Sequence, residues 1–121
     1  MAGSSSTGGT AGIAVMRGVP PTLADCELTF HERRPIGLDL AVAQHTAYGD
    51  LLRSLGLEVV ELPADPALPD CCFVEDVAVV LDEVALLTMP GAASRRGEIA
   101  AVEEALARFR PFERTALPAT L

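Results

Sequence analysis

Apolar residues in this chain gather alternately into short continuous runs and into longer stretches with helical spacing, and this alternation strongly constrains the fold. The runs over residues 13–16 and 57–62 fit strands, and residues 38–55 between them fit a helix that Gly56 is placed to end. The apolar residues that recur at helical spacing in this stretch are Ala41, Tyr48, Leu51, Leu52 and Leu55. A strand, a helix and a strand in this order predict a βαβ unit.

A second unit with the same alternation follows. Residues 73–81 are almost continuously apolar, which predicts a strand buried on both faces, and residues 84–87 predict its hairpin partner after Asp82-Glu83. Ser94 is a suitable N-cap for a second helix, and a last strand is expected to begin near Phe112. The apolar stripe of that helix consists of Ile99, Val102, Leu106 and Phe109. The predicted fold class is therefore α/β, with a βαβ unit followed by most of a ββαβ unit.

Length and composition exclude several classes of protein. The chain has 121 residues, enough for one small domain, and its hydrophobic content of 50% excludes a wholly disordered chain. No apolar run approaches the roughly 18 residues of a membrane-spanning helix. The formal net charge is −8, with nine arginines and no lysine, so neither a nucleic acid nor a membrane is expected as a partner. Acidic character suits a cationic small ligand, or is simply a solvated surface.

The N-terminus and the cysteines indicate where the domain begins and where the protein resides. Residues 1–12 are rich in Ser and Gly and lack the apolar core of a signal peptide, so we expect a flexible tail followed by a domain over 13–121. The three cysteines, Cys26, Cys71 and Cys72, are too few and too close together for a disulfide framework. The spacing of the cysteines also argues against a structural zinc site. Reduced cysteines without an export signal predict a cytoplasmic protein.

Three carboxylates stand at the start of the apolar run: Asp70, Glu75 and Asp76. Strand alternation would place Asp76 on one face and Glu75 on the other. Carboxylates that enter a buried strand need a compensating cation or hydrogen bonds. A guanidinium ligand is one solution, because its planar donors match carboxylates two at a time. The alternative is a solvated strand start paired with the chain's own arginines, and from the residues alone we favour it.

Arg95 and Arg96 directly follow the predicted N-cap, where the helix macrodipole disfavours cations. They either grip an anion such as a substrate carboxylate or form an ordinary exposed pair, and the sequence favours neither. The acidic residues that could answer an exposed pair are Glu98, Glu103 and Glu104.

The thiols of Cys71 and Cys72 are candidate nucleophiles, but cysteines in an apolar strand are more often small core residues. Neither His31 nor His45 has a context that pairs it with a cysteine. We therefore do not expect a complete Cys–His catalytic set within this sequence.

Residues 62–80, with the Phe73-Val74-Glu75-Asp76 sequence, and residues 88–98, with Pro90-Gly91 and Ser94-Arg95-Arg96, together resemble the dimethylarginine dimethylaminohydrolase family. The resemblance runs from about Ile13 to Leu121. It implies a pentein-type α/β propeller of five ββαβ modules, of which this chain would hold the first two or so. It also implies hydrolysis of Nω-methylated arginine to citrulline and a methylamine through a cysteine thiouronium intermediate. No metal or cofactor is implied, and the expected partner is the small-molecule methylated arginine.

The resemblance assigns roles to particular residues. By position, Asp70, Glu75 and Asp76 match acidic substrate-binding residues. Arg95 matches an arginine that binds the substrate's α-carboxylate, and Leu28 matches a lid residue whose backbone meets the substrate's amino end.

Two features depart from the family pattern. Met89 stands where an arginine is common, which puts the local ion pairing in doubt. The nucleophilic cysteine and the general-acid histidine are expected beyond Leu121, so the sequence reads as an N-terminal part of the enzyme without catalytic residues, inactive by itself. Two alternatives stay open: a truncated, non-catalytic chain that binds a cationic ligand or a protein partner, and a related pentein such as an arginine deiminase.

Overall fold

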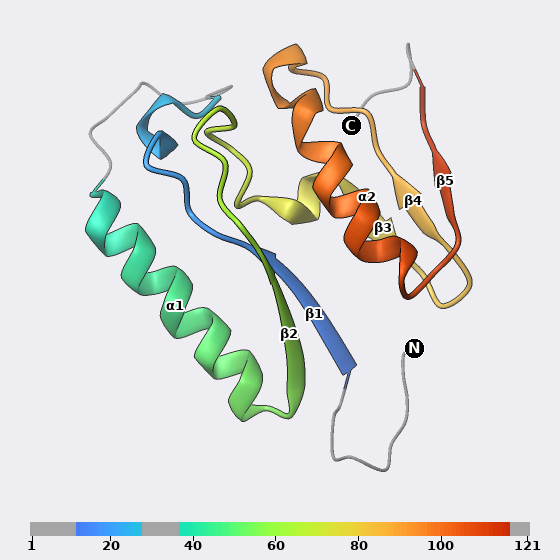
Figure 1. The fold of residues 1–121 in the computed structure, drawn as a ribbon, viewed down its shortest axis with the longest axis horizontal. Coiled ribbons are helices and arrows are strands. Elements are labelled where there is room, and N and C mark those ends of the chain that lie inside the picture. Colours follow the sequence, from blue (N-terminus) through green and yellow to red (C-terminus); the bar gives the residue numbers. More distant parts are fainter. Residues whose placement is uncertain (1–11, 28–36, 117–121) are drawn as a thin grey trace.

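The computed structural model describes residues 12–27 and 37–116, which form two units of strands and helices (Figure 1). In the first unit, β1 (Gly12–Arg17) and β2 (Leu57–Leu62) are parallel, and α1 (Leu38–Ser54) connects them. Gly12 pairs with Leu57 and Arg17 with Leu62, so both strands end at the same edge. The predicted βαβ unit is confirmed. Of the predicted tail, Gly12 begins β1 and the remaining residues lie outside the described part of the chain.

Helix α1 ends where the sequence predicts, but a different face of it packs. Gly56 follows the helix with φ of +92°, the left-handed conformation that favours glycine. Of the apolar residues at helical spacing, Ala41 and Leu52 are half-buried, whereas Tyr48, Leu51 and Leu55 are 56%, 54% and 63% exposed. The buried residue of the helix is Gly49, where an added Cβ would lie 3.5 Å from the sulfur of Met16. A small residue at this crossing lets helix and strand approach closely, which turns the larger apolar side chains away.

The second unit contains β3 (Ala78–Val80), β4 (Ala85–Leu87), α2 (Ile99–Ala107) and β5 (Phe112–Arg114). β3 and β4 are antiparallel, and β4 and β5 are parallel. The predicted hairpin and the ββαβ order are confirmed. Over the described residues, neither α1 nor α2 has the length and the apolar character that a bilayer-crossing helix requires.

The long strand predicted over residues 73–81 is wrong in its first half. Val74–Asp76 is a 3-10 helix, and the strand itself covers Ala78–Val80. The backbone N–H of Thr88 still donates to the carbonyl of Val77 in the register of the hairpin, and its hydroxyl donates to the carbonyl of Asp76. The residues before this point form local turns instead, in which the N–H groups of Asp76 and Val77 donate to the carbonyls of Phe73 and Val74. Asp76 and Glu75 therefore lie in a 3-10 turn and not on the two faces of a strand. Val79 and Val80 are 45% and 50% exposed rather than buried on both faces.

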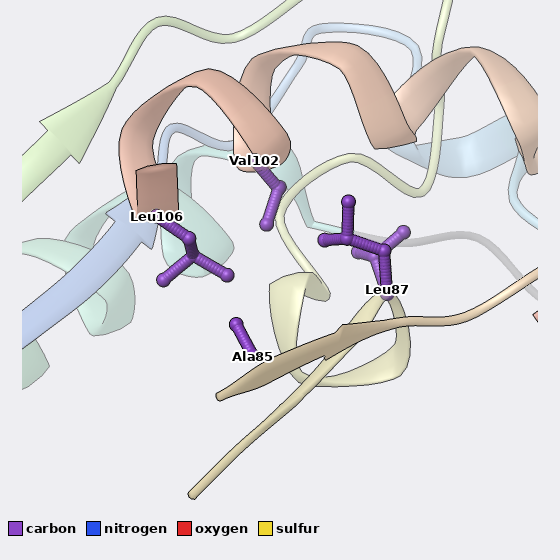
Figure 2. Close-up of a cluster of buried hydrophobic side chains, with 5 residues drawn as sticks. Ala85, Leu87, Val102 and Leu106 are labelled. Atoms are coloured by element: carbon purple, nitrogen blue, oxygen red, sulfur yellow. The ribbon is translucent and has the colours of Figure 1, made fainter. Parts of the chain in front are cut away.

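Helix α2 begins later than predicted. A 3-10 helix over Ala93–Glu98 precedes it, and the hydroxyl of Ser94 binds the carboxylate of Glu27 instead of capping the helix. Val102 and Leu106 are buried as expected, whereas Phe109 lies beyond the helix end. Figure 2 shows these two α2 side chains pointing toward Ala85 and Leu87 of β4. Together with Val77, they form the buried apolar cluster of the second unit.

Candidate functional site

The segments that follow β1 and β2 meet at the edge where both strands end. The backbone N–H of Gly18 donates to the carbonyl of Leu62 at 3.0 Å, and the hydroxyl of Thr22 donates to the carbonyl of Pro66 at 2.8 Å. The thiol of Cys71 lies 3.8 Å from the carbonyl oxygen of Gly18. Because ligands of α/β proteins bind outside the carboxyl ends of parallel strands, these loops form a candidate binding region.

Asp70 is buried within this region. Its side chain accepts a hydrogen bond of 3.0 Å from the backbone N–H of Glu27, and the residue is 5% exposed. The carboxylate of Glu27 in turn accepts the hydroxyl of Ser94, which lies in the 3-10 helix before α2. Asp70 thus joins the loop after β2 to the loop after β1. Leu28, the predicted lid residue, lies outside the described residues.

Arg95 links the acidic loop to the 3-10 helix that precedes α2. Its Nη1 atom lies 2.9 Å from Oδ2 of Asp76. Its Nε and Nη2 atoms donate to the two carboxylate oxygens of Glu98 at 3.0 and 2.8 Å. The side chains of Arg95 and Glu98 are 14% and 1% exposed. The hydrogen bond to Glu98 is the main cause of a raised pKa for Arg95, so this guanidinium stays charged.

The remaining predicted site residues separate into two groups. Asp70, Asp76 and Arg95 lie together, because Nη2 of Arg95 is also 3.4 Å from the carbonyl oxygen of Asp70. Glu75 instead lines a separate pocket. Arg96 is not free for an anion in this arrangement, since it donates to the carbonyl oxygens of Pro90 and Gly91 at 3.1 and 3.2 Å.

The observed pairs correspond to the interpretation in which the carboxylates pair with the chain's own arginines. Asp76 and Glu98 pair with the chain's own Arg95, whereas Glu103 pairs with Arg114. From the sequence alone, Glu98 is one of three acidic residues that could pair with an exposed arginine. Its spacing of three residues from Arg95 is the signal that could have identified it.

The pocket that contains Glu75 has a volume of about 540 Å³ and lies between the two units. Its apolar wall comes from β1, β3 and α2. The polar groups in its lining belong to His45, Tyr48, Cys72, Glu75 and Arg110. A pocket with an apolar wall and few polar groups can hold a small organic ligand or an apolar segment of protein.

The described cysteines do not have the environment of a nucleophile. Cys71 is 1% exposed. Burial is the main cause that raises the pKa of the Cys72 thiol to about 11, and the neighbouring Cys71 adds to it. A catalytic thiol needs the opposite shift, toward the thiolate. His45 pairs with Glu61 at 3.2 Å, and no group of three or more potential metal ligands occurs in the part of the chain that the structure describes.

Comparison of the sequence with known proteins identifies one family. The chain is 48% identical over 97 residues to the N(G),N(G)-dimethylarginine dimethylaminohydrolase of Streptomyces coelicolor, covering 79% of this chain and 37% of that protein. It is 41% identical over 83 residues to the Pseudomonas aeruginosa enzyme of the same name, covering 67% of this chain and 33% of that protein. The chain thus spans about a third of the length of these relatives. No family model matches it.

Solved structures agree. A dimethylarginine dimethylaminohydrolase variant in adduct with S-methyl-L-thiocitrulline superposes with a TM-score of 0.82 at 35% identity, covering 89% of this chain and 43% of that one. The P. aeruginosa protein complexed with citrulline gives 0.81 at 35% identity, covering 88% and 42%. The N-terminal domain of ArgZ, an arginine dihydrolase of cyanobacteria, gives 0.78 at 14% identity, covering 90% and 41%. This last match shows a shared α/β fold.

Proposed function

Because this chain is a homologue of the dimethylarginine dimethylaminohydrolases, we propose that it forms part of the substrate site of such an enzyme, which hydrolyses Nω-methylated arginine to citrulline and a methylamine. The citrulline complex of the P. aeruginosa relative supports this product. We further propose that the two units are modules of a pentein-type propeller. The order β3, β4, α2, β5 makes one ββαβ module, and β1, α1, β2 match its last three elements.

The observation that carries the proposal is the position of Asp76. Its side chain is half exposed, and one carboxylate oxygen is held by Arg95. The other oxygen is available to a guanidinium, whose planar N–H groups match carboxylate oxygens. Asp70 stabilises the adjoining loop from within, and Glu75 lies on the pocket side. We propose that Asp70, Glu75 and Asp76 together make the site acidic and therefore selective for a cationic substrate.

The roles of Arg95 and Leu28 stay proposals carried over from the family. The resemblance assigns the α-carboxylate of the substrate to Arg95, a role that requires the contact between Arg95 and Asp76 to open, and assigns the amino end to the backbone of Leu28. The positive charge of Arg95 is secure, because its pKa is raised by Glu98.

The covalent step requires a different cysteine from those described. In the proposed reaction, a thiolate attacks the guanidinium carbon, a histidine protonates the departing methylamine, and water hydrolyses the thiouronium to citrulline and regenerates the thiol. Cys72, with a pKa of about 11, is almost entirely protonated at neutral pH. We propose that the nucleophile and the general acid are not among the described residues. A separate proposal, from the reduced cysteines, is that the chain acts in the cytoplasm.

A second candidate function is binding without turnover. The acidic site and the protonated Cys72 also fit a chain that holds a cationic ligand and does not hydrolyse it.

Two measurements test these proposals. Calorimetric titration of the chain with dimethylarginine should give saturable binding, and citrulline, whose side chain is neutral, should bind more weakly. Equal binding of both ligands, or none of dimethylarginine, would contradict the proposed site. A citrulline-release assay on the same sample should give no turnover. Turnover that disappears in Cys72→Ser would place the nucleophile in this chain.

A further inference from the structure

We infer that Glu98 and Arg95 form a buried clamp, fixed to the second unit, that positions Asp76 and the loop over residues 70–77. Glu98 is then a positioning residue of the site. The consequence for ligand binding rests on the proposed function, whereas the clamp itself rests on the contacts below.

The donors of Arg95 point mainly into the protein. A guanidinium has five N–H groups, and three nitrogen atoms of Arg95 carry them. Nε and Nη2 bind Glu98, and Nη1 binds Asp76. Nη2 also lies 3.4 Å from the carbonyl oxygens of Asp70 and Phe73. While these contacts hold, Nη1 has one N–H left, so Arg95 cannot offer a substrate carboxylate the two parallel donors of a bidentate pair.

The same contacts reach three points of the acidic loop. They hold the backbone at Asp70 and at Phe73 and the side chain of Asp76. The loop folds as local turns, with the N–H of Phe73 donating to the carbonyl of Asp70 and that of Asp76 donating to the carbonyl of Phe73. Arg95 therefore contacts the loop at each of its successive turns and fixes how the carboxylate of Asp76 is presented.

Glu98 fixes Arg95 in turn. Its carboxylate is 1% exposed, and both oxygens accept hydrogen bonds from Arg95. A buried carboxylate without its cation is strongly disfavoured, so the two side chains hold each other. Glu98 directly precedes α2, whose Val102 and Leu106 belong to the buried cluster of the second unit. The clamp thus connects the acidic loop to that core.

The half-buried thiol of Cys72 provides a reporter within the loop. A reagent reaches such a thiol when the segment opens locally, so the rate of modification measures how firmly the loop is held. Cys26 lies on the neighbouring loop, beside Glu27, whose N–H binds Asp70, so the urea midpoint of each variant is measured as the reporter of global unfolding.

The test compares Glu98→Gln with Glu103→Gln. Glu103 makes a similar two-oxygen pair with Arg114, but on the surface and away from the loop. Modification of Cys72 by a disulfide reagent, followed by peptide mass spectrometry, should be about tenfold faster in Glu98→Gln than its urea midpoint accounts for, and should not change in Glu103→Gln. Arg95→Lys keeps the positive charge but loses the planar set of N–H donors, so it should accelerate Cys72 modification as Glu98→Gln does.

Ligand titrations separate the clamp from direct carboxylate binding. Glu98→Gln should weaken dimethylarginine and methylguanidine, which has no carboxylate, by the same factor. Unchanged Cys72 modification in both Glu98→Gln and Arg95→Lys, or an acceleration that a lower urea midpoint fully accounts for, would overturn the clamp. The two proposals can fail separately. If Cys72 modification is faster in the variants but the wild type binds no dimethylarginine, the clamp stands and the proposed function is refuted.

Discussion

The carboxylate of Asp76 lies 2.9 Å from Nη1 of Arg95, so two residues predicted to hold opposite ends of one substrate are in direct contact. An arginine-like ligand carries its guanidinium and its carboxylate at the two ends of an extended chain. A touching pair cannot hold both ends at once. Ligand entry therefore either separates Asp76 from Arg95 or leaves Arg95 in its place as a support for the loop, and the Glu98 contacts favour the second course.

Cys72 provides a prediction about pH. Its pKa is raised from 9.0 to about 11 in the fold, mainly by burial, so folding favours the neutral thiol. This contribution is fully present below pH 9 and is lost as the pH rises through about 11. The free energy of unfolding of the wild type should therefore fall over this interval, and Cys72→Ser should reduce the fall. Urea denaturation at several alkaline pH values measures it, and an identical decline in both proteins would contradict the assigned environment.

Truncation of a buried side chain of α2 and of an exposed side chain of α1 should change the free energy of unfolding by different amounts. Leu106→Ala removes a buried side chain of the core cluster and should lower the free energy of unfolding by about 2–5 kcal/mol. Leu51→Ala, at a position 54% exposed, should change it by less than about 0.5 kcal/mol. Chemical denaturation of both variants tests the packing. A larger loss in Leu51→Ala would mean that the outer face of α1 is covered in solution.

Gly49 tests the close approach of α1 to β1. An added Cβ would lie 3.5 Å from the sulfur of Met16, an ordinary contact distance. Gly49→Ala should therefore be accepted and should gain about 0.5–1 kcal/mol from helix propensity. Gly49→Leu should instead be destabilising by about 1–3 kcal/mol, because its side chain would force the helix from the strand. The midpoints of thermal unfolding rank the three proteins, and a stable leucine variant would rule out the tight crossing.

The order and pairing of the elements could be predicted from local patterns. Both helices, the parallel pair and the hairpin follow from apolar spacing and from turn residues such as Gly56. The predicted strand over 73–81 is wrong in its first half because residues 73–77 form local turns, in which the N–H groups of Asp76 and Val77 donate to the carbonyls of Phe73 and Val74. The packed face of α1 could not be predicted from the large apolar residues, because the buried residue of the helix is its glycine, Gly49.

The candidate site was predicted in composition but not in arrangement. Charge type identified Asp70, Asp76 and Arg95, which the structure brings together. The pairing of Arg95 with Glu98 depends on a 3-10 turn that precedes the helix, whereas an α-helix had been expected from Ser94. Glu75 and Asp76 lie on different surfaces, as strand alternation predicts, but the backbone that carries them is a 3-10 turn and not a strand.

Titration of Asp76→Asn with dimethylarginine tests the central claim, that this carboxylate receives the guanidinium. The substitution keeps the size of the side chain and removes its charge, and Asp82→Asn, at an exposed position in the β3–β4 connection, is the matched control. Loss of a charge-assisted hydrogen bond of about 1.5–3 kcal/mol should weaken binding roughly 10- to 150-fold in Asp76→Asn and leave Asp82→Asn like the wild type. Equal affinity of all three proteins for dimethylarginine would contradict the account.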